Sequence, residues 1–329
     1  MLFNLFVQLL VWCCMLSEAL IQGPFTDDFT EWLQSAGYDG YDFPSLHLGI
    51  NSSFGGRAVA HEKIINRPIV FIHGNSDGAL DHGTEYSSGW SESIRYFLQG
   101  GYNPSSLYAI TWGDRNLKNS FARTHSCATL LRLRRFLEAV LRYTGHPEID
   151  IVAHSMGVTL ARRIIKGGSV SDDVEECDLG EPMNHKIVTF VGIAGANYGL
   201  CLCSTEIAQV APACGLKTGF WSGENCEDSE AAACATSLEE PSCGLKYGEF
   251  LMRLNEDSSK EAKFIASFYS LGDEVVGSNN MVWGRNTSVI PQSDESYVFA
   301  SLRHHELKSK TLKQQFEVIT GGKKTSDNF

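Results

Sequence analysis

A serine flanked by small residues is the feature of this sequence best suited to chemistry. Ser155 is the third residue of an AHSMG segment that follows an apolar run and precedes a helical pattern. A sharp turn from strand to helix exposes the hydroxyl of such a serine and needs small neighbours, here Ala153 and Gly157. The serine is then placed to act as a nucleophile, provided that other parts of the chain supply a base and an acid. The alternative is a serine that only caps the helix.

The acid and the base are expected later in the chain, because serines on this kind of turn are followed first by the acid and then by the histidine. Asp273 is our candidate acid, since it directly follows a buried-strand pattern, although an aspartate there also suits a turn or a helix cap. His304 and His305 are the only histidines after it. We favour His304 as the base, because it ends a loop whereas His305 already starts a helical pattern. The alternative acids are Glu274, Asp257 and Asp294.

The negative charge that forms on an attacked carbonyl oxygen needs hydrogen-bond donors. Met156 follows the serine, so its backbone N–H lies at the start of the helix and is our first candidate. The loop after an earlier strand should supply the second donor, and Asn75 N–H is in that position. His73 and His154 stand next to these groups and are interpreted as structural.

Strand patterns alternate with helical patterns over most of the chain, which predicts a mainly parallel sheet with helices on both faces. The predicted strands are 69–72, 107–112, 149–152, 186–193 and 264–270, and the predicted helices are 89–98, 127–143, 158–165 and 305–319. Ligands bind at the carboxyl ends of the strands in such sheets. His73, Ser155 and Asp273 all lie just beyond a strand of this set.

The N-terminal residues and the net charge indicate where the protein is located and which partners it has. Residues 1–16 form an apolar stretch, and the small residues Ser17 and Ala19 follow, which predicts a secretory signal segment cleaved after about Ala19 and hence a secreted protein. We expect no transmembrane segment, and residues 20–329 are predicted to form a single domain. The net charge of −12 argues against a nucleic-acid partner.

Cysteines gather in one stretch that interrupts the regular pattern. Of ten cysteines, two lie in the signal segment and six of the other eight lie in 198–243. An even number in a secreted chain favours disulfides, whereas the spacing of Cys201 and Cys203 does not fit a structural zinc site. The stretch is either a cap beside the site or a braced surface loop, and both remain open. Asn51 and Asn286 begin glycosylation sequons.

Four pieces of this sequence together resemble the class 2 lipases. They are 69–74 (IVFIHG), 153–157 (AHSMG), 271–273 (LGD) and His304 with Thr311 beyond it. This family consists of secreted α/β-hydrolases, and the chain is most similar to its invertebrate members, while the alanine in the turn is shared with minimal bacterial lipases. The resemblance covers about residues 60–320. It implies triacylglycerol lipase or carboxylesterase activity without a cofactor, and the residue roles given above.

We therefore predict a secreted serine hydrolase with an α/β-hydrolase fold that cleaves carboxylic esters through an acyl-enzyme. Its expected partners are a lipid or ester substrate and, transiently, a lipid surface. An acyltransferase or a thioesterase would use the same residues, and a lipid-binding protein without turnover is the alternative from another class. The small lipases of the family have little or no lid, so the insertion at 198–243 departs from them.

Overall fold

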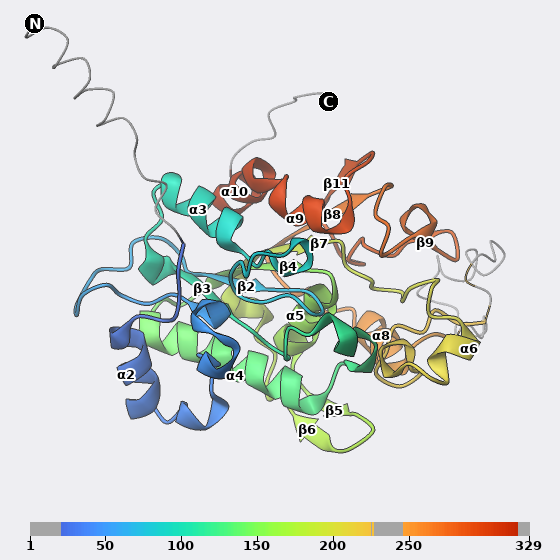
Figure 1. Ribbon diagram of the computed structural model, residues 1–329, viewed down its shortest axis with the longest axis horizontal. Coiled ribbons are helices and arrows are strands. Elements are labelled where there is room, and N and C mark those ends of the chain that lie inside the picture. Colours follow the sequence, from blue (N-terminus) through green and yellow to red (C-terminus); the bar gives the residue numbers. More distant parts are fainter. Residues whose placement is uncertain (1–20, 225, 227–245, 322–329) are drawn as a thin grey trace, which may run out of the picture.

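A seven-stranded sheet organises the chain (Figure 1). In the computed structural model, which describes residues 21–224, 226 and 246–321, the strand order is β1-β3-β2-β4-β7-β8-β11. β1 pairs antiparallel with β3, and every other neighbouring pair of the sheet is parallel. The strands are Ser53–Phe54 (β1), Leu107–Ile110 (β3), Ile69–Ile72 (β2), Ile149–His154 (β4), Ile187–Ile193 (β7), Phe264–Ser270 (β8) and Glu295–Phe299 (β11). The mainly parallel sheet predicted from the sequence is confirmed.

All five predicted strands are present, and two strands of the sheet were not predicted. β1 has only two residues, and β11 alternates half-buried and exposed positions instead of forming an apolar run. Two small hairpins lie outside the main sheet. They join Ser169–Ser171 (β5) to Glu176–Asp178 (β6) and Met281–Val282 (β9) to Arg285–Asn286 (β10).

Helices cover both faces of the sheet, as predicted (Figure 1). Asp27–Ser35 (α2), Cys127–Thr144 (α4), Met156–Lys166 (α5) and Glu249–Glu256 (α8) pack on one face, and Ser91–Gln99 (α3), His304–Ser309 (α9) and Leu312–Thr320 (α10) pack on the other. The short helix Thr205–Ala208 (α6) lies in the insertion. None of the helices within the described ranges combines the length and the apolar content that a membrane crossing requires.

The prediction of one helix over 305–319 is wrong, because two helices occupy this region. α9 starts one residue earlier, at His304, and ends at Ser309, and α10 starts at Leu312. The break falls at Thr311, whose hydroxyl donates to the carbonyl of Leu307 at 2.6 Å. A threonine side chain bonded to the carbonyl four residues earlier competes with regular helical geometry, so the chain turns there.

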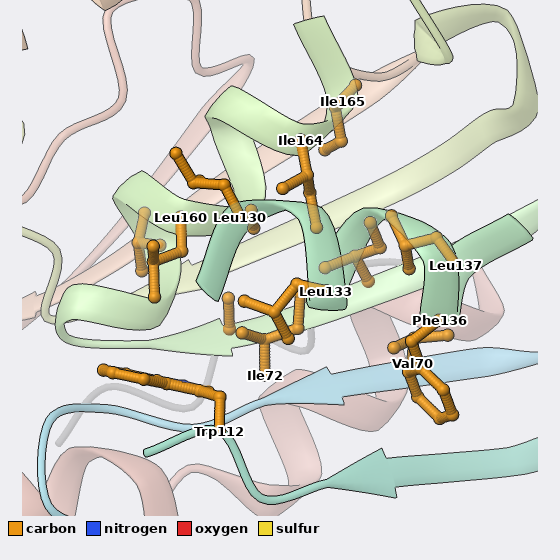
Figure 2. Close-up of a cluster of buried hydrophobic side chains, with 14 of the residues drawn as sticks. Val70, Ile72, Trp112, Leu130, Leu133, Phe136, Leu137, Leu160, Ile164 and Ile165 are labelled. Carbon is orange, nitrogen blue, oxygen red and sulfur yellow. The ribbon is translucent and has the colours of Figure 1, made fainter. Parts of the chain in front are cut away.

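The core follows the alternation of side chains along the strands. In β2, Val70 and Ile72 face α4 and α5, whereas Ile69 and Phe71 belong to the cluster under α3, α9 and α10. Figure 2 shows side chains of α4 and α5 packed over Val70 and Ile72. α4 has a helix start and stop of the usual chemistry: Ser126 accepts the N–H of Thr129, and Gly145 ends the helix with φ 66°. This packing fixes the strands whose carboxyl ends carry the candidate site.

Within the described residues, three disulfides tie loops to this frame. Cys127–Cys177 joins the start of α4 to β6, and Cys201–Cys226 and Cys203–Cys214 brace the insertion. Cys201 and Cys203 therefore belong to two different disulfides rather than to a pair of zinc ligands. The predicted signal segment 1–19, Cys234 and Cys243 lie outside the described residues.

Candidate active site

Ser155 stands at the turn between β4 and α5. Its backbone is left-handed, with φ 55° and ψ −130°, and its N–H donates to the carbonyl of Ile193 at 2.8 Å. A non-glycine residue held at positive φ is strained, and such strain is common at functional sites. The side chain of Ser155 makes no capping hydrogen bond to α5, so the hydroxyl is not used as a helix cap. A Cβ on Gly157 would lie 2.5 Å from the carbonyl oxygens of Ile72 and His73, which explains the small residue there.

His304 and Asp273 face one another at the ends of β8 and β11. His304 Nδ1 lies 2.8 Å from Oδ2 and 3.0 Å from Oδ1 of Asp273, and both side chains are almost fully buried. An ionised carboxylate can only accept hydrogen bonds, so Nδ1 must carry the proton. In the neutral form of this ring, Nε2 carries no proton and can accept one from another group.

The charge state of Asp273 supports this tautomer. Burial alone would raise the pKa of Asp273, but the hydrogen bond and charge of His304 and two backbone N–H groups outweigh it and hold that pKa below its ordinary value. The N–H groups belong to Val275 and Val276 and lie 3.0 and 2.9 Å from Oδ1. The aspartate therefore closes a turn, as one sequence interpretation had it, and also contacts the histidine.

The alternatives to these two residues make other contacts, although His305 lines the same pocket as His304. The ring of His305 packs edge-on against Tyr86, with centroids 5.4 Å apart. Glu274 accepts the backbone N–H of His304 at 3.0 Å, so it holds the backbone rather than the ring. Asp257 pairs with Lys166, and Asp294 pairs with Lys260.

The helix that carries His304 is fastened at several points. Lys308 Nζ forms a buried ion pair with Asp77, and the carboxylate of Asp77 also accepts the N–H groups of Gly78 and Gly89 at 2.9 Å each. On the other side, Nε2 of His154 lies 3.1 Å from the backbone carbonyl oxygen of His304. A carbonyl oxygen can only accept, so the proton of the His154 ring is on Nε2. The helix α9 is thereby connected both to the loop after β2 and to β4, the strand that ends at His154.

Burial keeps the neighbouring histidines neutral. Desolvation is the largest effect on His154 and lowers its pKa well below the ordinary value; it also lowers the pKa of His73 to about 3. Nε2 of His73 accepts the N–H of Trp112 at 3.0 Å, and the two rings stack. His73 therefore shapes the loop after β2, as its structural interpretation expected.

That loop presents Asn75. Its side chain is fully engaged, since Nδ2 donates to the carbonyl of Ser120 and Oδ1 accepts from Arg123, both at 2.8 Å. The backbone N–H is the part of Asn75 left for a ligand. Arg123 also donates to Ser76 Oγ at 2.6 Å and pairs with Asp114, so it holds the whole loop. Sequence analysis missed Arg123, because it lies in a polar segment with no periodic pattern.

One pocket of about 240 Å³ brings most of the candidate residues together. Ser155, Met156, Asn75 and His304 line it, while Asp273 contacts His304 from behind. Most of the remaining wall is apolar. It includes Leu117, Phe121, Ala194, Ala196, Leu200, Leu202, Cys203, Ala213, Cys214, Phe220, Val275 and Val276. Six of the described residues of the insertion, all between 200 and 220, thus line the pocket.

Among the described residues, the side chains that come together with metal-ligand chemistry are Cys127, Asp172 and Glu175. The sulfur of Cys127 is bound in a disulfide, so it cannot act as a thiolate ligand. The carboxylate of Asp172 accepts three backbone N–H groups at 2.7 to 2.8 Å, including that of Cys127. This cluster is explained by loop structure.

Comparison with known proteins gives a family match and several distant structures. The family model for lipase (class 2) matches residues 66–317. A monoacylglycerol lipase of Paleococcus ferrophilus is 13% identical over 82% of this chain and 98% of that chain, with a TM-score of 0.46. A Bacillus licheniformis lipase in its mature form is 14% identical over 80% and 96%, with a TM-score of 0.45. The family match and the strand order agree on the predicted α/β-hydrolase fold.

Proposed function

Because the chain belongs to the class 2 lipase family, whose chemistry is ester hydrolysis, we propose that it is a secreted triacylglycerol lipase or carboxylesterase with Ser155, His304 and Asp273 as its catalytic residues. The observation that carries the proposal is the contact of His304 Nδ1 with Asp273 at the edge of a pocket that Ser155 also lines. Because Nδ1 contacts Asp273, Nε2 is the nitrogen of His304 that remains to act as a base in the pocket.

In the proposed reaction, Ser155 Oγ attacks the ester carbonyl carbon while His304 Nε2 takes the hydroxyl proton. The oxyanion that forms is held by the backbone N–H groups of Asn75 and Met156, each contributing about 3–4 kcal/mol to transition-state stabilisation. His304 returns the proton to the leaving alcohol oxygen, and an acyl-Ser155 ester remains. A water molecule, deprotonated by His304, then attacks this ester; His304 passes the proton to Ser155 Oγ as the acyl–oxygen bond breaks, and the carboxylic acid is released. Asp273 keeps the imidazole oriented and stabilises its positive charge.

The rim of the pocket supports a lipid substrate. Leu117, Phe121 and Leu202 are each more than half exposed and also line the pocket. Exposed apolar side chains grouped around a site mark a surface for an apolar partner. We propose that these residues make transient contact with a lipid surface. The three disulfides support passage through an oxidising compartment, which agrees with the predicted secretion.

The test is labelling by a serine-directed fluorophosphonate together with hydrolysis of p-nitrophenyl esters and of triacylglycerol emulsions. We expect the wild-type protein to be labelled at Ser155 and to hydrolyse esters, and Ser155→Ala to do neither. Folded wild-type protein that is neither labelled nor active would refute the hydrolase. Product analysis with water and a competing alcohol distinguishes hydrolysis from acyl transfer, and a thioester substrate tests the thioesterase alternative.

A further inference from the structure

We propose that residues 200–220 form a permanent wall that binds the acyl chain, and that Ala213 sets the length of chain accepted. This inference rests on the proposed function, because it concerns the same pocket. Residues 200–220 are then the part of the insertion that selects the substrate, and they keep a fixed position instead of opening and closing.

The acyl side of the pocket follows from the proton transfer. The leaving alcohol must lie toward His304, which returns its proton, and α9 packs on the sheet face shared with α3 and α10. Cys203, Cys214 and Phe220 of the insertion instead join the core on the α4 and α5 face, together with Met156. The acyl chain, leaving the carbonyl carbon on the side away from the alcohol, therefore meets the apolar wall of the insertion.

Bonds within the segment hold this wall together. The Cys203–Cys214 disulfide closes its loop. The N–H of Leu200 donates to the carbonyl of Phe220 at 2.9 Å, and the N–H of Phe220 donates to the carbonyl of Ala213 at 2.7 Å. The two ends of the wall are thus joined directly beside the pocket.

Other bonds fasten the wall to the body of the domain. The carbonyl of Thr218 accepts both the backbone N–H of His125 at 3.0 Å and its ring Nδ1 at 2.7 Å. At the start of α8, the N–H of Glu249 donates to the backbone carbonyl of Leu216 at 2.7 Å, and the N–H of Phe250 donates to the backbone carbonyl of Lys217 at 2.9 Å. Swinging the segment away would break these hydrogen bonds at once, and each broken bond costs free energy. This supports a fixed wall.

Ala213 has the shortest side chain among the residues of the insertion that line the pocket. It is buried and lines the pocket, and it directly precedes Cys214 of the Cys203–Cys214 disulfide in the sequence. A longer side chain at 213 would occupy space that a long acyl chain needs and leave space for a short one. Leu200 lines the same wall, so its truncation would extend the space.

The experiment compares kcat/KM for p-nitrophenyl acetate, butyrate, octanoate and laurate. We expect Ala213→Leu to lower the ratio of laurate to acetate turnover by on the order of tenfold or more, with acetate turnover retained, because filling a hydrophobic pocket discriminates by this amount per methylene. Leu200→Ala should change the ratio in the opposite direction. The matched control is Ala208→Leu, which adds the same atoms on α6, outside the pocket lining, and should leave the profile unchanged.

The outcomes separate this inference from the function itself. If the wild type hydrolyses esters but Ala213→Leu and Leu200→Ala both keep its chain-length profile, the acyl wall is refuted and the hydrolase stands. If Ala213→Leu does not fold, Leu200→Ala still gives a result of predicted sign. Hydrogen exchange tests the fixed position: the amide of Phe220 should be protected as strongly as the amides of α5, and rapid exchange there would overturn the permanent wall.

Discussion

At Asp273, burial and hydrogen bonding act on the pKa in opposite directions. Burial raises this pKa, whereas His304 and the N–H groups of Val275 and Val276 lower it by more than burial raises it. The carboxylate therefore stays ionised at neutral pH although its side chain is fully enclosed. This is what the proposed mechanism needs, because only an ionised acid fixes the proton on Nδ1 of His304 and stabilises the imidazolium that forms.

We predict that Asp273→Asn lowers kcat for a soluble ester by about 10⁴-fold while the fold is retained. The amide nitrogen of the asparagine can donate to Nδ1, which moves the ring proton to Nε2 and prevents it from accepting the serine proton. The measurement is kcat at neutral pH together with a thermal melt by circular dichroism. Asp257→Asn, at one of the alternative acids, is the control and should keep full activity. Comparable losses in both variants would contradict the assignment.

Most of the residues found from sequence lie shortly after a strand. Asn75, Ser155 and Asp273 could be placed because an apolar run ends just before them, and His304 because few histidines remain. Arg123 has no such marker, since only the folded loop brings its guanidinium to Asn75. The hydrogen bond from His154 to the His304 carbonyl is equally invisible in sequence, because the two residues lie 150 positions apart.

At the scale of elements, the stability of the short helix α9 depends more on its contacts with other elements than on its own hydrogen bonds. It has six residues, fewer than an isolated helix needs to be stable in water. Its buried Lys308 pairs with Asp77 from the loop after β2. Burial would raise the pKa of Asp77, but the charge of Lys308 and neighbouring hydrogen bonds hold that pKa below its ordinary value. Breaking this pair should therefore loosen the base and the oxyanion loop together.

We predict that Lys308→Met lowers the free energy of unfolding by about 3–5 kcal/mol, because it leaves a buried carboxylate without its partner. The double variant Asp77→Asn, Lys308→Met should recover much of this loss, since an asparagine oxygen can still accept the N–H groups of Gly78 and Gly89. Urea unfolding followed by circular dichroism measures both. A single variant within 1 kcal/mol of wild type, or a double variant less stable than the single one, would argue against this role of the pair.

The elements that sequence analysis missed are those that packing decides. β11 shows no apolar run, and it forms because β8 offers a free edge along which residues 295–299 pair in register. The break between α9 and α10 depends on the bond of the Thr311 hydroxyl to the carbonyl of Leu307, which no periodicity reveals. The long amphipathic helix α4, by contrast, was predicted to within a residue at each end.

At the scale of the whole molecule, the cysteine count predicted disulfides but could not say which cysteines pair. Pairing depends on distances that the fold sets, such as the approach of β6 to the start of α4 for Cys127 and Cys177. The same holds for the role of the insertion. Sequence left a cap and a surface loop equally open, and only the structure places Leu200, Ala213 and Phe220 on the pocket wall.

Buried neutral histidines give the whole molecule a common response to acid. Desolvation lowers the pKa of His73 to about 3 and that of His125 to about 4, and it lowers the pKa of His154 as well. In the unfolded chain these rings titrate near 6.5. The unfolded state therefore binds protons that the folded state does not, so stability is complete above pH 6.5 and is lost as the pH falls toward the folded pKa.

His125 allows this to be tested away from the catalytic residues. Its folded pKa of about 4, against 6.5, corresponds to roughly 3 kcal/mol of stability lost between these two pH values. We predict that His125→Gln, which removes the titration but keeps polar atoms for Thr218 and Thr159, reduces the fall in unfolding free energy over this window by that amount. Urea unfolding at a series of pH values measures it. Leu137→Ala, in the core under α4, should lower stability equally at every pH, and a His125→Gln curve parallel to that of the wild type would show that this ring does not govern the acid response.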